Sequence, residues 1–196
     1  MCLKKKPITL TGDIEIDEVY LVAGHKGQPS AVSHQGRKGR RRRLKGKRGR
    51  GTLVEEKPPI IGMIQRGGQV VIRMLENVQQ KTIKPLITHT IQAGSLIYTD
   101  EYNIYNRLTH WGFAHKTVNH SQGEYARDED GDGFHEIHVN TIEGFWSLLR
   151  SWLRPHRGIS QEKLPLYLAF FETVHNIRAR GKALLPALLS LFFSPP

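Results

Sequence analysis

The first regular pattern in the chain is an alternation of polar and apolar residues that begins the segment 13–20. Ile14 and Ile16 fall on one face of the strand that this alternation predicts. The other face carries three carboxylates, which are Asp13, Glu15 and Asp17. A solvated strand face accounts for such a row of acids equally well, so a functional reading depends on acids elsewhere in the chain.

The middle of the chain predicts a hairpin, two helices and two more strands. Apolar runs at 59–65 and 69–75 are joined by Arg66-Gly67-Gly68, which is a hairpin signal. Beyond them we expect a helix from Thr82 to Gly94, a buried strand at 95–99, a short helix at 101–110 and a last strand at 115–119. The buried strand leads directly into Asp100. Residues 124–136 predict a polar, acidic loop.

The segment that follows predicts an amphipathic helix, begun by Asn140 or Thr141 as a polar cap. Its apolar residues recur at three- and four-residue steps, and they are Ile142, Phe145, Trp146, Leu149 and Leu153. Glu143 and Arg150 lie together on a second face beside this stripe. The pair Asn140 and Glu143 also matches a capping box, in which the glutamate only closes the start of the helix.

A longer helix is expected from about 160 to 180, so the predicted order is β-β-β-α-β-α-β-α-α. Three strands in a meander followed by alternating helices and strands predict a mixed α/β sheet covered by helices. We divide the 196 residues into an extension at 1–11, one domain at 12–180 that includes a basic loop at 24–51, and an apolar packing segment at 181–196.

Charge is concentrated in that loop. The formal net charge is +11, and ten basic residues lie in the run Arg37, Lys38, Arg40, Arg41, Arg42, Arg43, Lys45, Lys47, Arg48 and Arg50. Outside it, 19 basic residues nearly balance 18 acidic ones. A local polycation of this density predicts nucleic-acid binding through phosphates, without sequence preference.

Composition excludes several other classes of protein. The mean hydropathy of −0.43 and the 38% hydrophobic content are typical of a globular protein rather than a membrane or disordered one. The one cysteine, Cys2, excludes an intramolecular disulfide framework and fits a reducing cytoplasm. The start of the chain shows no apolar run of the kind found in a signal peptide.

Three acids fall on different predicted elements that can meet in such a sheet. Asp17 lies on the first strand, Asp100 at the end of the fourth, and Glu143 on the helix after the last strand. Converging carboxylates need a cation to neutralise them, and oxygen ligands select Mg²⁺ or Mn²⁺. We hypothesise two ions for phosphoryl transfer, with Asp17 bridging them, Asp100 and Glu143 each holding one, and Arg150 contacting a substrate phosphate.

At this point the sequence resembles a known family, the insertion-sequence transposases with a DDE core, and most closely their ISXO-like subgroup. The motifs that carry the resemblance are Glu15–Tyr20, Tyr98–Tyr102, Val118–Ser121, His138–Ser147 and Tyr167–Asn176. The resemblance implies an RNase H-like fold, with a mixed five-stranded sheet flanked by helices, and a catalytic triad at Asp17, Asp100 and Glu143. It also implies metal-dependent cleavage and strand transfer at transposon ends, by a homo-oligomer on transposon and target DNA.

The same resemblance implies a cytoplasmic, nucleoid-associated bacterial protein with no membrane partner.

The chain departs from the subgroup in three ways. Arg150 stands where the family more often has lysine, the subgroup sometimes has asparagine at the position of Glu143, and these residues include no segment like its usual cysteine-rich zinc ribbon.

Alternatives remain at the level of sequence. The residues Asp128, Asp130, Asp132 and Gly133 copy the opening of a calcium loop, but Val139 occupies the position that needs a glutamate, so we read an acidic loop. Histidines around this loop suggest an HNH-type nuclease, but the ββα arrangement that such a nuclease needs is not apparent in the sequence. His120 and His138 either line the DDE site or cap local structure. A basic nucleic-acid-binding module, or an inactive transposase remnant, would have the same basic run without catalysis.

Overall fold

A computed structural model describes residues 7–34, 36, 49–119, 126–128, 131–133, 135–178, 186 and 189. Its centre is a five-stranded sheet in the order β3-β2-β1-β4-β5. The strands are β1 (Asp13–Tyr20), β2 (Pro59–Gln65), β3 (Val70–Met74), β4 (Leu96–Thr99) and β5 (Ala114–Thr117). The predicted basic run from Arg37 to Arg48 and His120 lie outside the described residues, as does almost all of the predicted apolar segment 181–196.

Strand directions define the topology. β1, β2 and β3 form an antiparallel meander, whereas β4 runs parallel to β1, and β5 runs parallel to β4. A meander followed by parallel strands on the other side of β1 is the strand arrangement of the RNase H-like fold. The predicted fold class, a mixed five-stranded sheet flanked by helices, is therefore confirmed.

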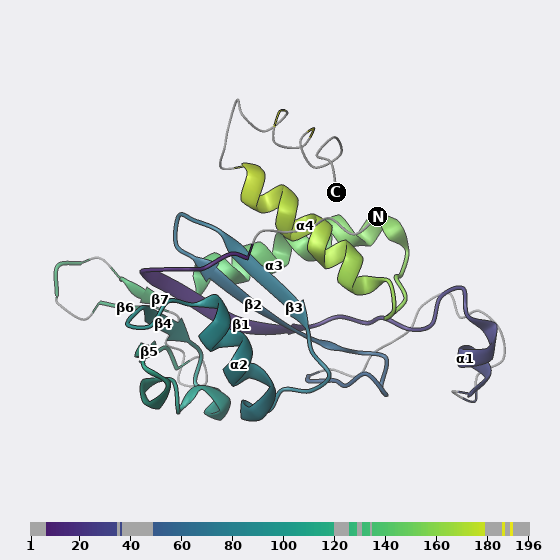
Figure 1. Ribbon diagram of the computed structural model, residues 1–196, viewed down its shortest axis with the longest axis horizontal. Helices are drawn as coiled ribbons and strands as arrows, with labels where there is room; N and C mark the ends of the chain where they lie inside the picture. Colours follow the sequence, from purple (N-terminus) through teal and green to yellow (C-terminus); the bar gives the residue numbers. More distant parts are fainter. Residues whose placement is uncertain are drawn as a thin grey trace.

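Helices cover both faces of the sheet (Figure 1). On one face, α2 (Gln80–Thr90) packs Ile83 and Ile87 against a core that includes Ile14 and Ile16 of β1. On the other face, α3 (Asn140–Leu153) and α4 (Leu164–Arg178) pack against a second core that includes Val19 and Tyr98. Alternate residues of β1 therefore face different layers, and the odd-numbered ones face α3.

The predicted helix at 101–110 is wrong. Two short 3₁₀ helices replace it, η1 (Asn103–Tyr105) and η2 (Thr109–Trp111). The Asp100 carboxylate accepts the backbone N–H of Tyr102, whose extended backbone stops a helix from running on from β4. Asn103 and Asn106 also have low helix propensity, whereas the apolar residues of this segment still reach the core.

Other differences concern the bounds of elements and small additions. α2 ends at Thr90 rather than near Gly94, because Ile91 forms a bridge with Leu10. α4 begins at Leu164, after Ser160 pairs with Gly24. The expected loops contain short elements, which are α1 (Pro29–His34), the two-stranded β6 (Ala126–Arg127) and β7 (Ile137–His138), and η4 (Arg154–His156). None of the described helices is long and apolar enough to cross a membrane.

Candidate active site

Asp17 and Asp100 occupy matching places on two neighbouring parallel strands. Glu15 of β1 is the register partner of Tyr98 in β4. Two residues further along each strand come Asp17 and, directly after the end of β4, Asp100. Since side chains two residues apart share a face of a sheet, this register directs both acids toward the layer that contains α3.

Trp146 of α3 brings the third acid to the same place. Its indole Nε1 donates a hydrogen bond of 2.9 Å to Oδ2 of Asp17. The ring can lie this close because Asp17 pairs across the sheet with Gly62, where an added Cβ would stand 2.5 Å from the indole. Glu143 precedes Trp146 by three residues, which is nearly one helical turn.

The pKa of Asp17 reflects the approach of the other two acids. The pKa of Asp17 is raised to about 6, first by burial and also by the negative charges of Asp100 and Glu143. The backbone N–H of Glu18 and the indole of Trp146 act in the opposite direction by hydrogen bonding to the carboxylate. The structure thus brings Asp100, at the end of β4, and Glu143 of α3 within electrostatic reach of Asp17 on β1.

Convergence is not the same as a formed metal site. Within the part of the chain that the structure describes, no three histidine, cysteine, aspartate or glutamate side chains are arranged so that they could hold a metal ion. One oxygen of Asp17 is engaged by Trp146, and Asp100 accepts the N–H of Tyr102. Metal binding by the three acids therefore stays a prediction.

A fourth acid, Glu18, was not singled out from the sequence. It lies on the face of β1 opposite to Asp17, where the hydroxyl of Tyr105 donates a hydrogen bond to it. Burial raises the pKa of Glu18 to about 8, although Tyr105 opposes this effect. The signal was present in the sequence, because Glu18 follows Ile14 and Ile16 at an even position that should be apolar.

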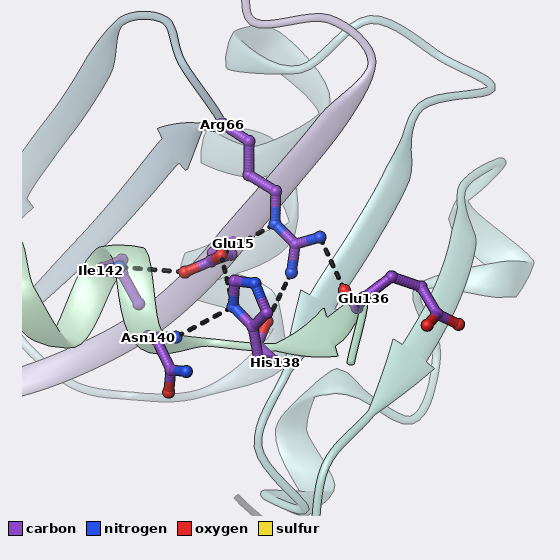
Figure 2. A network of polar contacts seen from close by, with 6 residues as sticks. All are labelled: Glu15, Arg66, Glu136, His138, Asn140 and Ile142. Carbon is purple, nitrogen blue, oxygen red and sulfur yellow. Dashed lines mark hydrogen bonds and ion pairs between the residues drawn. The ribbon is translucent and has the colours of Figure 1, made fainter. Parts of the chain in front are cut away.

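Glu15 is the most deeply enclosed acid, with no exposed surface. Its Oε1 accepts the Nε–H of Arg66 at 2.8 Å, and its Oε2 accepts the backbone N–H of Ile142 at 2.9 Å (Figure 2). The alternative of a solvated face on β1 is therefore wrong at Glu15. The capping-box alternative is wrong too, because the N-cap residue of α3 is Val139, which makes no side-chain cap hydrogen bond, and Glu15 of β1 accepts the N–H of Ile142 instead.

Arg66 also contacts two backbone carbonyls and one aromatic ring. Its two terminal nitrogens donate to the backbone carbonyls of Glu136 and His138, each at 2.7 Å. Its guanidinium also lies over the ring of Tyr98, 3.9 Å from the centroid. The sequence pattern marked Arg66 only as a turn residue, and nothing in it indicated that one arginine contacts three elements.

His138 takes part as a cap. Its Nδ1 accepts the backbone N–H of Asn140 at 3.3 Å and lies 3.3 Å from Oε1 of Glu15. Burial lowers the pKa of His138, and Arg66 lowers it further while Glu15 opposes the change. A lowered pKa favours the neutral imidazole, which is the form that can accept the N–H of Asn140.

Two of the predicted DNA-binding arginines belong to the described residues. Arg150 is exposed on α3 and lines, with Arg154 and apolar residues at 21–23, a shallow hollow of about 200 Å³. The guanidinium of Arg50 lies 3.5 Å above the ring centroid of Tyr102, close in sequence to Asp100. The basic run therefore ends beside the candidate site.

The fold is RNase H-like, and acids from three elements approach one another beside its central parallel strands β1 and β4. The chain belongs to the family of ISXO2-like transposase domains, whose model matches residues 9–172. The resemblance seen in the sequence is thereby confirmed.

Known proteins agree with this assignment. The chain is 36% identical over 187 residues to an uncharacterized protein in transposable element ISH50 of Halobacterium salinarum, which covers 92% of this chain and 58% of that protein. It is 30% identical over 95 residues to an uncharacterized transposase-like protein of Haemophilus influenzae, covering 48% of this chain and 71% of the relative. The chain thus spans less than two thirds of the first of these relatives.

Among solved structures, a chain of a simian T-cell lymphotropic virus intasome in complex with PP2A regulatory subunit B56 gamma aligns with a TM-score of 0.42 and 10% identity. The alignment covers 86% of this chain and 49% of that chain. A likeness at this level says nothing about activity.

Proposed function

We propose that this chain is the catalytic domain of a transposase that cleaves DNA at insertion-sequence ends and transfers the freed strand to target DNA. The observation that carries the proposal is the meeting of Asp17, Asp100 and Glu143 from three elements, in a chain of this family. Asp17, Asp100 and Glu143 are the acids that we propose as catalytic residues.

The donor chemistry suits a hard divalent cation. All three side chains offer only oxygen ligands, and mutual repulsion helps to raise the pKa of Asp17, so a bound cation would relieve an unfavourable interaction. When bound, two Mg²⁺ or Mn²⁺ ions would lower the pKa of the attacking hydroxyl and neutralise charge on the leaving oxygen. Trp146 would have to share or release Oδ2 of Asp17 when an ion binds.

The reaction itself is an exchange of phosphoester bonds. In cleavage, a water oxygen attacks a backbone phosphorus, the bond from phosphorus to the 3′-oxygen breaks, and that oxygen takes up a proton to give a 3′-hydroxyl. In strand transfer, this hydroxyl attacks a target phosphorus and displaces another 3′-oxygen, while its own proton passes to solvent. The chain would need no residue as a general base, because cations held by the three acids would lower the pKa of the attacking water or hydroxyl enough for its proton to pass to solvent.

DNA would be held along two basic parts of the surface. Arg150 lies on α3 about two turns beyond Glu143, a spacing that would let it contact a phosphate next to the reacting one. Arg50, the last residue of the basic run, stacks on Tyr102 and would place a positive charge beside the site for DNA to contact. Assembly as a homo-oligomer on two DNA ends, as the family resemblance implies, is part of the same proposal.

The experiment is a comparison of metal-dependent nicking with DNA binding. Supercoiled plasmid is incubated with the chain and Mg²⁺ or Mn²⁺, and nicked product is measured for the wild type and for Asp17→Asn, Asp100→Asn and Glu143→Gln. We expect each variant to lose at least a hundredfold in rate and to retain plasmid affinity. Glu76→Gln is the control, because it neutralises an exposed acid just after the end of β3 and should change neither quantity.

A wild-type chain that binds plasmid but does not nick it with either metal would favour the basic binding module or the inactive remnant instead. Unchanged nicking by the three variants would show that the acids are not catalytic.

A further inference from the structure

Arg66 touches the neighbours of all three candidate catalytic acids. Through Nε it binds Glu15, which precedes Asp17 by two residues on the same face of β1. Its guanidinium stacks on Tyr98, which precedes Asp100 by two residues. Its contact with the carbonyl of His138 reaches the segment that leads into α3. Figure 2 shows the hydrogen bonds of Arg66, the residue after β2, with Glu15, Glu136 and His138.

Glu15 joins the same elements more directly. Its Oε2 accepts the N–H of Ile142, which is the residue before Glu143. A single hydrogen bond therefore ties the position two residues from Asp17 to the position one residue from Glu143. Because Glu15 is fully buried, water does not compete for this bond.

We infer that Glu15 and Arg66 are positioning residues, which fix α3 against β1 and β4 and so hold Glu143 within electrostatic reach of Asp17, with which it would share cations. This inference rests on the function proposed above. Neither residue would touch metal or DNA. Their removal would act by letting the start of α3 move away from β1.

The chemistry of the contact makes the effect of one substitution specific. Glu15 gives one oxygen to Arg66 and the other to Ile142. In Glu15→Gln only one oxygen remains, so the amide nitrogen must face either the Arg66 Nε–H or the Ile142 N–H, and one of these contacts is lost. The variant is nearly isosteric, so packing around the side chain is retained.

The chain contains a matched control. Glu172 of α4 is also fully buried, and it accepts Arg73 Nη1 at 2.6 Å and the N–H of Ile72 at 3.0 Å. It ties α4 to β3, two elements that carry none of the three acids. Glu172→Gln controls for the loss of a buried charge, and Glu172→Ala for a general loss of stability.

Two measurements test the inference in the full chain. The first is the affinity for Mn²⁺ by calorimetry, which should fall about tenfold or more in Glu15→Gln, as is usual when residues that orient metal ligands are changed. The second is the indole N–H signal of Trp146 in a ¹⁵N spectrum, assigned with Trp146→Phe, because this group bonds Asp17. We expect the signal to shift or broaden in Glu15→Gln and to stay in place in both Glu172 variants.

If Glu15→Gln does not fold, Arg66→Lys takes its place, because a lysine cannot contact Glu15 and both carbonyls at once. An unmoved Trp146 signal with Mn²⁺ affinity within twofold of the wild type would overturn the inference, as would equal changes in Glu172→Ala. Failure of the wild type to bind Mn²⁺ would instead refute the proposed function, and the Trp146 signal would still decide whether Glu15 and Arg66 position α3.

Discussion

Replacing Asp17 by asparagine should stabilise the metal-free protein at neutral pH. The carboxyl is held in a buried place near two other acids, and its pKa is raised from 3.8 to about 6. Each unit of pKa shift corresponds to 1.36 kcal/mol, so ionising Asp17 costs the folded state about 3 kcal/mol. Asparagine carries no charge and retains an oxygen for the indole of Trp146.

The pH dependence follows from the sign of the shift. Because the folded-state pKa lies above the unfolded value, the folded protein binds more protons than the unfolded chain between about pH 4 and pH 6. The stability that Asp17 contributes is present below pH 4 and is lost as the pH rises through 6. The difference in free energy of unfolding between Asp17→Asn and the wild type should therefore grow from near zero at pH 4 to about 3 kcal/mol above pH 6.

Urea unfolding followed by tryptophan fluorescence, in metal-free buffer from pH 4 to pH 7.5, measures this difference directly. Other titrating groups are common to both proteins and largely cancel. A variant that is less stable than the wild type at pH 7, or a difference that does not change with pH, would refute the account of Asp17 as a buried acid close to two others.

Two further predictions concern residues around Asp17. Gly62→Ala should lower the free energy of unfolding by about 1–3 kcal/mol, since the new methyl would stand 2.5 Å from the Trp146 ring. Gly144→Ala should raise the free energy of unfolding, because a Cβ there meets nothing within 4 Å. Thermal unfolding compares the two variants, and equal effects would contradict the close approach of Trp146. Glu18, with its pKa raised to about 8, should be protonated at pH 7. The wild type should therefore lose stability relative to Glu18→Gln as the pH rises through 8. If the free energies of unfolding of the two proteins run parallel between pH 6 and 9, Glu18 is not held in its neutral form.

The sheet and the places of the three acids could be predicted from the sequence because each depends on a local pattern. Alternation located β1, and the apolar stripe located α3 together with the face that carries Glu143. Asp100 was found because an acid directly after a buried strand falls at the end of that strand. Their meeting then followed from the order of strands and helices.

The Glu15–Arg66 contact could not be found in this way. Both residues fit ordinary local roles, as an acid on a strand face and as a turn residue, and the contact joins positions 51 residues apart. Similarly, the capping-box pattern of Asn140 and Glu143 is locally complete, but Glu15 supplies the acceptor from another element. Local patterns do not report which of two available partners is closer in the folded protein.

The measurement that tests the central claim most directly is a Mn²⁺ titration of the wild-type chain and of Asp17→Asn, followed by calorimetry and by the electron paramagnetic resonance of the bound ion. The account predicts saturable binding by the wild type, and loss of that binding in Asp17→Asn at a concentration where both proteins are folded. Equal binding by the two proteins, or no binding by the wild type, would contradict the claim that Asp17, Asp100 and Glu143 share divalent cations.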